Sequence, residues 1–246
     1  MNYILEVSYN GSNYYGWAIQ PNLKTVNGTL HEIIKFLFND EFIVYSSSRT
    51  DKGVHAIQQV INLKFQTLTI EPEILMKAIN SRLPYDIRIK KCIIVKTSFN
   101  IQNNVKEKTY RYFINTNINF DPIFQTNFYQ YNKQIDIEKI NSIKHLFLGK
   151  KNFLSFSTSE FKSKDCIRNI FAMNIFKNHD YVIFEIKGDG FLRNMVRMII
   201  GTLLAFNEDK INIDDINDCF VNPKKGKSKF KVPACGLYLY RVKYEN

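Results

Sequence analysis

The order in which hydrophobic periodicity changes along the chain is the feature that most restricts its fold. In the first half, alternating apolar residues predict four strands, at 3–9, 42–46, 58–65 and 87–95. Apolar residues at helical spacing predict two helices, at 26–38 and 72–83. Thr25 is a suitable N-cap for the first helix, and Pro84 ends the second. The resulting order, β-α-β-β-α-β, is that of a ferredoxin-like unit.

The second half repeats this order. Strands are expected at 108–114, 168–177, 181–187 and 237–244, and helices at 137–147 and 191–206, with a short extra helix at 214–220. Asp136 is expected to cap the helix at 137–147, and Gly149 to stop it. We therefore predict an α+β fold of two tandem ferredoxin-like halves with antiparallel sheets. The polar stretch 100–106 places the boundary between predicted domains 1–104 and 105–246.

The charge of the chain points to a polyanionic partner. Its formal net charge is +11, an excess that most often accompanies nucleic-acid binding. The alternative is drift in a composition rich in Ile, Asn and Lys. If the helices cover one face of each sheet, the other face is free to form a broad RNA-binding cleft.

Other classes of protein lack support in the sequence. There is no run of 18 apolar residues and no signal-peptide pattern at the N-terminus, so a cytoplasmic location is expected. The four cysteines are scattered without CxxC spacing, and the histidines show no metal-ligand spacing. P-loop, dinucleotide-binding and GxSxG motifs are absent. We expect neither a cofactor nor a metal. The zinc signature of a base deaminase is also missing.

The segment Ser48–Ala56 lies between two predicted strands and is dense in reactive residue types. A guanidinium such as that of Arg49 keeps a nearby carboxylate such as Asp51 ionised, and an ionised Asp can act as a nucleophile or a base. Taken alone, the segment also fits an aspartate that merely caps a turn at Gly53.

Two further segments carry candidate site residues. Arg193 and Arg197 are spaced to share a face of the helix predicted at 191–206, and apolar neighbours make Arg197 partly buried and in need of a partner. We select Asp51 as that partner, although a solvent-facing arginine stripe is an alternative. The strand containing Tyr110 combines aromatic and basic residues that can stack bases and bind phosphates, or can be ordinary strand composition.

Basic residues outside these segments are candidates for RNA contact. Only eight of the 34 basic residues are arginine, which suggests that each arginine marks a need for the guanidinium fork. The lysine-dense stretch 222–231 is either a phosphate-binding loop or a solvated one. The candidate substrate-binding residues are Tyr110, Arg168, Arg193, Lys224, Lys225 and Lys227.

Six segments, in chain order, resemble motifs of the tRNA pseudouridine synthase A family. They are Tyr9–Trp17 with Gln20 (Y-D-G-x-x-Y-x-G-W), Thr25–Leu30 (T-V-Q-G-x-L), Ser48–Ala56 (G-R-T-D-x-G-V-H-A), Lys108–Tyr112 (the tyrosine strand), Phe191–Gly201 (F-L-x-x-M-V-R-x-I-x-G) and Pro233–Leu239 (A-x-G-L-x-L). Because these segments span nearly the whole chain in the family's order, the resemblance is specific.

The resemblance implies a function and roles for individual residues. It implies isomerisation of uridine to pseudouridine on the 3′ side of the tRNA anticodon stem-loop, by a cytoplasmic homodimer without cofactor or metal. Asp51 would be the catalytic aspartate, and Arg49 would help to flip the target base out of the stack. The resemblance also implies catalytic roles for Tyr110 and Arg197: Tyr110 would stack on the flipped uracil and serve as the base in the last proton transfer, and Arg197 would pair with Asp51.

The chain departs from the family pattern at five places: Asn10, Ala18, Ser48, Lys52 and Gln102–Asn104. The last replaces R-F-S, and loss of that arginine puts RNA contact or the dimer in question. A non-enzymatic tRNA-binding protein on the same fold is therefore the competing hypothesis.

Overall fold

The protein is described from a computed structural model that covers residues 1–120, 123, 127–158 and 166–245. The chain forms two compact units. Unit 1 contains Met1–Lys108 and Tyr238–Asn246, and unit 2 contains Thr109–Leu237. The predicted domains 1–104 and 105–246 follow sequence order, whereas in the structure the C-terminal strand belongs with the N-terminal unit.

The elements of unit 1 follow the predicted order. They are β1 (Asn2–Tyr9), α1 (Val26–Leu37), β2 (Phe42–Ser46), β3 (His55–Phe65), α2 (Pro72–Arg82), β4 (Ile87–Ile94), the short α3 (Ile101–Asn104) and β10 (Leu237–Tyr244). The Thr25 side chain accepts a hydrogen bond from the Gly28 amide, which confirms it as the N-cap of α1. β3 begins three residues earlier than the predicted start at Gln58.

Strand β3 organises the sheet of unit 1. Its neighbours run β4-β1-β3, with both pairs antiparallel, and the other edge of β3 is shared by two strands. β2 pairs antiparallel with the end of β3, from Ile61 to Phe65, and β10 pairs parallel with its start, at His55 and Ala56. The prediction of antiparallel sheets therefore holds for most pairs but not for β3 and β10.

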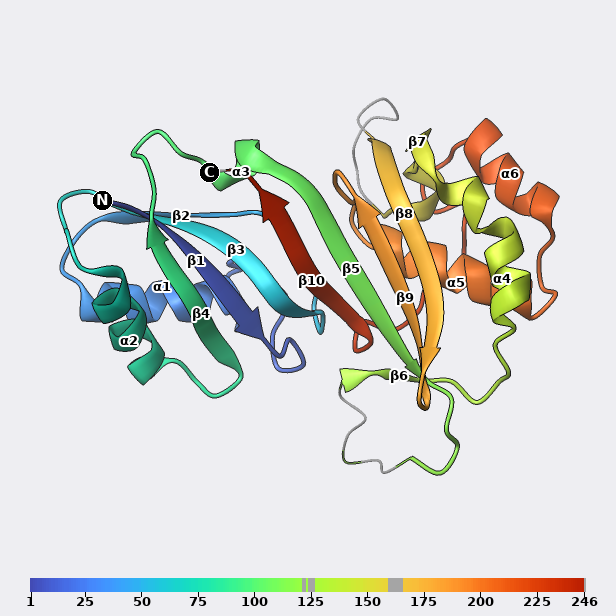
Figure 1. Ribbon diagram of the computed structural model, residues 1–246, viewed down its shortest axis with the longest axis horizontal. Coiled ribbons are helices and arrows are strands. Elements are labelled where there is room, and N and C mark those ends of the chain that lie inside the picture. The colour runs from blue at the N-terminus through green and yellow to red at the C-terminus, as the bar shows by residue number, and fades with distance from the viewer. Residues whose placement is uncertain (121–122, 124–126, 159–165, 246) are drawn as a thin grey trace. The chain divides into compact units, whose positions relative to one another are not determined.

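The helices of unit 1 complete its core. α1 and α2 contact each other on one face of the sheet (Figure 1). The β1 side chains Tyr3, Leu5 and Val7 are fully buried. They share the core with α1 and α2, whose own fully buried residues are Val26, Leu30, Ile34, Leu75 and Ile79. Alternation along β1 and helical spacing along α1 are the patterns that produce this packing.

Unit 2 contains the remaining elements. They are most of β5 (Val105–Asn115), β6 (Tyr129–Gln130), α4 (Ile137–Ile143), a 3-10 turn η2 (Lys144–Phe147), β7 (Gly149–Asn152), a second 3-10 turn η3 (Leu154–Phe156), β8 (Ile167–Asn178), β9 (Tyr181–Gly188), α5 (Met195–Asn207) and α6 (Ile213–Val221). Its strand order is β5-β9-β8-β7, with β8 antiparallel to both neighbours and β6 parallel to β5. Figure 1 shows α5 behind β8 and β9.

Two helices of unit 2 differ from the sequence prediction. Asp136 caps α4 through the Lys139 amide, as predicted, but the helix tightens into 3-10 geometry after Ile143. The predicted helix at 191–206 begins only at Met195, because Asn194 adopts a left-handed conformation with φ +62°. Asparagine tolerates that conformation better than most residues. The strands β6 and β7 were not predicted.

None of the helices in the described part of the chain has the length and hydropathy needed to cross a bilayer.

Candidate active site

The loop that carries Asp51 is fixed at its start by the neighbouring strand β3. The Ser47 amide donates to the Val60 carbonyl at 2.9 Å. The Gln59 side chain accepts from the Ser47 hydroxyl at 2.8 Å and donates to the Ser48 carbonyl at 2.7 Å. These bonds hold residues 48–54 where the chain leaves β2. This segment is named the catalytic loop after the role that the sequence predicts for Asp51.

A tight turn closes the catalytic loop at its other end. The Val54 amide donates to the Asp51 carbonyl at 3.1 Å, and Gly53 sits at φ +76°, which a glycine adopts without strain. Within the loop, Thr50 is buried and its hydroxyl hydrogen-bonds the Tyr9 hydroxyl at 2.8 Å. Arg49 is exposed and Asp51 is half-buried, so both side chains next to Thr50 are at least partly accessible to solvent.

A second loop, residues 10–17, is hydrogen-bonded to the catalytic loop through its backbone. The Trp17 amide donates to the Thr50 carbonyl at 3.0 Å, and the Gly53 amide donates to the Tyr14 carbonyl at 3.3 Å. A Cβ on Gly11 would lie 2.0 Å from the Val54 carbonyl oxygen, so only glycine fits there. The segment with Gly11 and Gly16 therefore packs against the catalytic loop and fixes its backbone.

His55 ends the catalytic loop inside the protein rather than at its surface. It is buried, its Nδ1 accepts a hydrogen bond from the Gly11 amide at 3.1 Å, and its ring stacks on Tyr238 at 4.6 Å. Accepting at Nδ1 requires the neutral imidazole with its proton on Nε2. The histidine therefore joins the two loops to β10.

Two candidate residues of unit 2, Tyr110 and Arg197, lie near the start of α5. Tyr110, on β5, is buried, and its ring meets that of Phe191 edge-on at 5.0 Å. The Arg197 guanidinium donates from Nε to the Val232 carbonyl at 2.8 Å and from Nη1 to the Asn194 side-chain oxygen at 3.0 Å. Arg197 is half-buried, as predicted, and these two oxygens fix its orientation. Its pairing with Asp51 would join the two units and stays a prediction.

Arg193 and Arg197 do not share a helix face, contrary to the sequence prediction. Arg193 precedes Asn194 and is exposed, and its carbonyl accepts from the Thr158 amide and the Ser157 hydroxyl, each at 3.2 Å. The left-handed turn at Asn194 separates the two arginines. The prediction was wrong because helical spacing was extended through that turn.

The remaining predicted basic residues differ in their surroundings. Arg168 is half-buried and donates to its neighbour's carbonyl, Ile167, at 2.6 Å. Lys224 and Lys225 are exposed, whereas Lys227 forms an ion pair with Asp218. Hydrogen bonds from Asn222 and then Lys227 lower the pKa of the Asp218 carboxyl. Lys227 therefore anchors its loop to α6.

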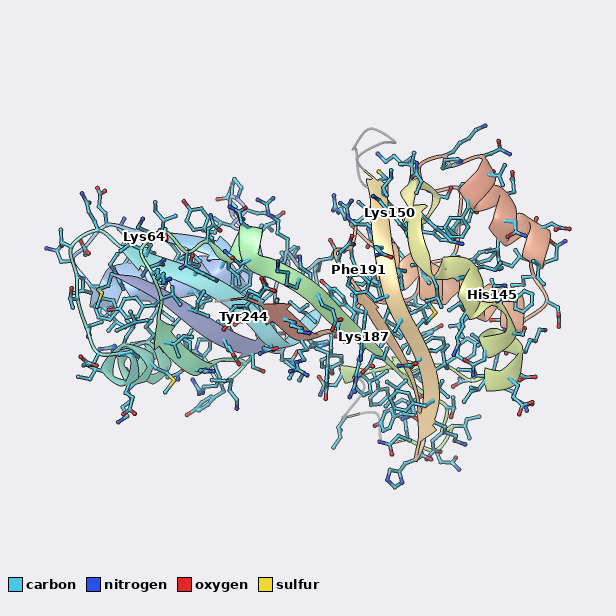
Figure 2. All side chains as sticks on the ribbon, turned by 45° about the horizontal axis from the view of Figure 1, so that its top comes forward. Lys64, His145, Lys150, Lys187, Phe191 and Tyr244 are labelled. Carbon is cyan, nitrogen blue, oxygen red and sulfur yellow. The ribbon has the colours of Figure 1, made fainter. Side chains whose placement is uncertain are left out.

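Sequence reasoning missed an ion cluster on neighbouring strands of unit 2. Arg111 on β5 contacts the Glu185 carboxylate through Nη2 at 2.7 Å and Nε at 2.8 Å, and Lys187 contacts it at 3.3 Å. Burial would raise the pKa of Glu185, but hydrogen bonds from Arg111 and Lys187 hold it below its ordinary value. Figure 2 labels Lys187, the second-last residue of β9, and Phe191, which follows that strand. A glutamate directly after the apolar run Val182–Phe184 of β9 was the available signal.

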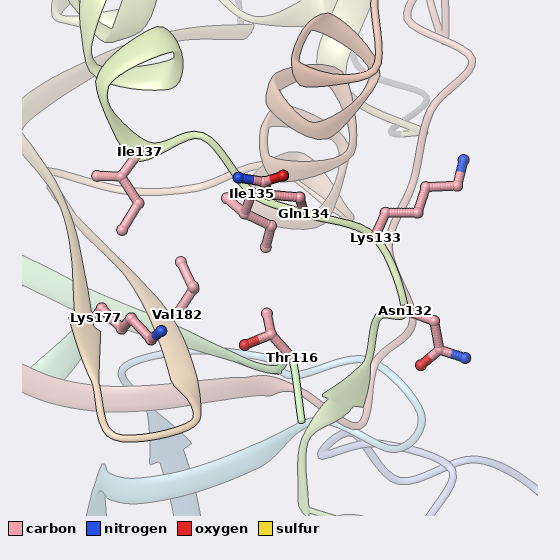
Figure 3. Close-up of a pocket in the computed structure, with 8 residues that line it drawn as sticks. All are labelled: Thr116, Asn132, Lys133, Gln134, Ile135, Ile137, Lys177 and Val182. Atoms are coloured by element: carbon pink, nitrogen blue, oxygen red, sulfur yellow. The ribbon is translucent and has the colours of Figure 1, made fainter. Parts of the chain in front are cut away.

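A pocket of about 380 Å³ lies elsewhere in unit 2, lined by residues 116, 132–135, 137, 177 and 182 (Figure 3). It contains none of the predicted site residues. Among the described residues, no group of three or more His, Cys, Asp or Glu side chains is placed to hold a metal ion.

Comparison with known proteins places the chain in a family. The sequence profile of a family described as tRNA pseudouridine synthase matches residues 6–102 and 143–245. The chain is 44% identical to tRNA pseudouridine synthase A of Malacoplasma penetrans over 99% of this chain and 100% of the relative. Identity is 42% with the Ureaplasma parvum protein and 40% with that of Mycoplasma genitalium, both named tRNA pseudouridine synthase A and both covered over at least 98% of their length. The chain belongs to the tRNA pseudouridine synthase family.

Proposed function

We propose that this protein isomerises uridine to pseudouridine in tRNA, on the 3′ side of the anticodon stem-loop, with Asp51 as the catalytic residue. The observation that carries the proposal is the half-buried Asp51 on a loop held by Gln59, Trp17 and Gly53. A catalytic side chain needs such a rigid support, because an error of about 1 Å in its position is costly. The family match over most of the chain supports the proposed reaction.

The reaction rearranges bonds within one nucleotide. The C1′–N1 bond breaks, a C1′–C5 bond forms, and the hydrogen on C5 is replaced while N1 gains one. No electrons or atoms are lost overall, so the reaction needs no redox cofactor. Asp51 is placed to act as a nucleophile or base on this nucleotide.

The target base must leave the RNA stack before Asp51 can reach it. Flipping costs a few kcal/mol in a helix. Arg49, exposed beside Asp51, is proposed to fill the gap that the base leaves. Tyr110 is proposed to stack on the flipped uracil, and Arg197 to pair with Asp51.

Contacts along the RNA are assigned to the exposed basic residues. Arg193, Lys224 and Lys225 are exposed and Arg168 is half-buried, so these four are proposed to contact phosphates. Lys227 contributes indirectly: its ion pair with Asp218 holds the loop that carries Lys224 and Lys225. We also propose that the protein is a cytoplasmic homodimer, which sedimentation at several protein concentrations tests.

The bond changes provide a direct test. Purified protein is incubated with unmodified tRNA carrying tritium at uridine C5, without cofactor. Because C5 exchanges its hydrogen for a carbon bond, an active synthase releases tritium to water, up to the number of target uridines. Tight tRNA binding without tritium release would reject the synthase in favour of the non-enzymatic tRNA-binding protein.

A further inference from the structure

We propose that Lys24 and Lys52 bind two phosphates of the RNA backbone beside the target nucleotide, each lysine being positioned by the ring of a tyrosine. Together with Tyr14 and Tyr15 they form the tyrosine–lysine clamp. The inference rests on the proposed function, because it takes RNA to be the ligand that meets Asp51.

The clamp is defined by two cation–ring contacts on adjacent tyrosines. The Lys52 ammonium lies 3.9 Å from the centroid of the Tyr15 ring, and the Lys24 ammonium lies 4.8 Å from that of Tyr14. Both distances are within the roughly 6 Å range of an attractive cation–π contact. The Tyr15 amide also donates to the Lys24 carbonyl at 2.9 Å, which fixes the two segments side by side.

The clamp is rigidly connected to the catalytic loop. Lys52 directly follows Asp51 in the sequence. Gly16 has φ +92°, and a Cβ there would lie 2.6 Å from the Thr50 carbonyl oxygen and 3.3 Å from the Lys52 nitrogen. The backbone after Tyr15 therefore lies directly against the catalytic loop, and a phosphate on Lys52 would be close to the nucleotide that meets Asp51.

The tyrosines differ in how they hold their lysines. Tyr14 is buried and its hydroxyl donates to the Asp86 carboxylate at 2.6 Å, so its ring is a fixed platform. Burial, together with Asp86, raises the pKa of Tyr14, which keeps the ring neutral. Tyr15 is 42% exposed, so the Lys52 contact occurs at the surface.

Both clamp lysines keep their charge available. Each is exposed, and within the described residues neither pairs with a carboxylate. By contrast, Lys133, Lys139 and Lys227 each pair with an acidic side chain. A ring face orients an ammonium group without neutralising it, so its N–H groups remain free to donate to phosphate oxygens.

The test compares tRNA binding by three lysine variants over a range of salt concentrations. Lys24→Ala and Lys52→Ala remove the clamp charges, and Lys77→Ala removes a control charge on α2 of the same unit. The Lys77 side chain is 77% exposed on α2, outside the clamp segments, and its ion pair with Glu73 is long, at 3.9 Å. Lys77→Ala therefore removes the same unit of charge outside the clamp. Each clamp variant is expected to reduce the slope of log affinity against log salt by about 0.7–0.9, and Lys77→Ala to leave it unchanged.

Two tyrosine variants test whether the ring positions the lysine. Tyr15→Phe keeps the ring and is expected to bind tRNA as the wild type does. Tyr15→Leu is expected to weaken binding about 2- to 5-fold, and to have no further effect when Lys52→Ala is already present.

The outcomes separate the clamp from the function on which it rests. If Lys24→Ala and Lys52→Ala give the same slope as Lys77→Ala while the wild type forms pseudouridine, the clamp is wrong and the function stands. Wild-type protein that fails to bind tRNA would overturn both. Reduced slopes without tritium release would support the clamp and reject the synthase.

Discussion

Gly16 and Thr50 touch backbone to backbone: a Cβ on Gly16 would lie 2.6 Å from the Thr50 carbonyl oxygen. Real Cβ atoms almost never lie closer than about 3.0 Å to such a heavy atom, so there is no room for a side chain at position 16. The Gly16 backbone is also at φ +92°, which favours glycine. The residue before the proposed catalytic aspartate thus packs directly against the backbone of a glycine far away in the sequence.

Gly16→Ala is therefore expected to damage both stability and activity. Backbone strain and the clash together should lower the free energy of unfolding by about 2–4 kcal/mol. The catalytic loop must move to relieve the clash, so kcat should fall more than tRNA affinity. Urea unfolding and tritium release measure the two effects.

Gly149→Ala is the matched control. Gly149 has φ +84°, but a Cβ there would meet nothing within 4 Å. This variant should lose only the strain energy, about 1 kcal/mol, and keep its activity. Equal losses of unfolding free energy and of activity in Gly16→Ala and Gly149→Ala would contradict a role for the close packing at Gly16.

Asn194→Ala is expected to disturb Arg197 without removing it. Asn194 adopts φ +62°, accepts from Arg197 at 3.0 Å and donates to the Thr158 hydroxyl at 2.7 Å. Alanine loses both bonds and is strained, which should destabilise the protein by about 2 kcal/mol and reduce kcat. Asn194→Gly should recover the part of the stability lost to backbone strain, but neither the two hydrogen bonds nor kcat, because glycine has no side chain to contact Arg197. Full recovery of kcat by glycine would show that the Arg197 contact is unimportant.

Acid should weaken a cluster at the end of α5. Hydrogen bonds from Lys133 and Lys210, with a further one from Tyr131, lower the pKa of Glu208 to about 2. A lowered carboxyl pKa contributes stability that is complete above the ordinary value of 4.5 and is lost as the pH falls towards 2. Because both lysines are about half exposed, the contribution should be about 1 kcal/mol.

Glu208→Gln tests this cluster through the pH dependence of urea unfolding. The variant should be less stable than the wild type at pH 7, and the difference should shrink as the pH falls below about 4. A difference that stays constant with pH would show that packing, rather than charge, explains the loss.

Local sequence signals accounted for most of the helices and strands. The bounds of β2 and β10 were predicted correctly, as were the capping residues Thr25 and Asp136. These features depend on alternation and on hydrogen bonds within one turn, which neighbouring residues specify. The predicted start of α5 at residue 191 was wrong, because a single left-handed residue, Asn194, interrupts an apolar pattern that is otherwise typical of a helix.

Features that depend on distant residues were beyond local patterns. The parallel pairing of β10 with β3 joins residues 238–239 to 55–56, and nothing in either segment specifies the other. For the same reason the ion cluster of Arg111, Glu185 and Lys187 was missed. The resemblance identified Asp51 as a candidate, but only the structure shows that Gly11, Gly16 and Trp17 support its loop.

The most direct test of the central claim is to map pseudouridine in unmodified tRNA after incubation with wild type or Asp51→Ala, using carbodiimide modification and primer extension. Asp51 is half-buried and its loop is held by backbone bonds, so Asp51→Ala should fold and bind tRNA normally. Pseudouridine is expected in the anticodon stem-loop with the wild type, and none with Asp51→Ala at equal tRNA affinity. Pseudouridine formed equally by both proteins would contradict it.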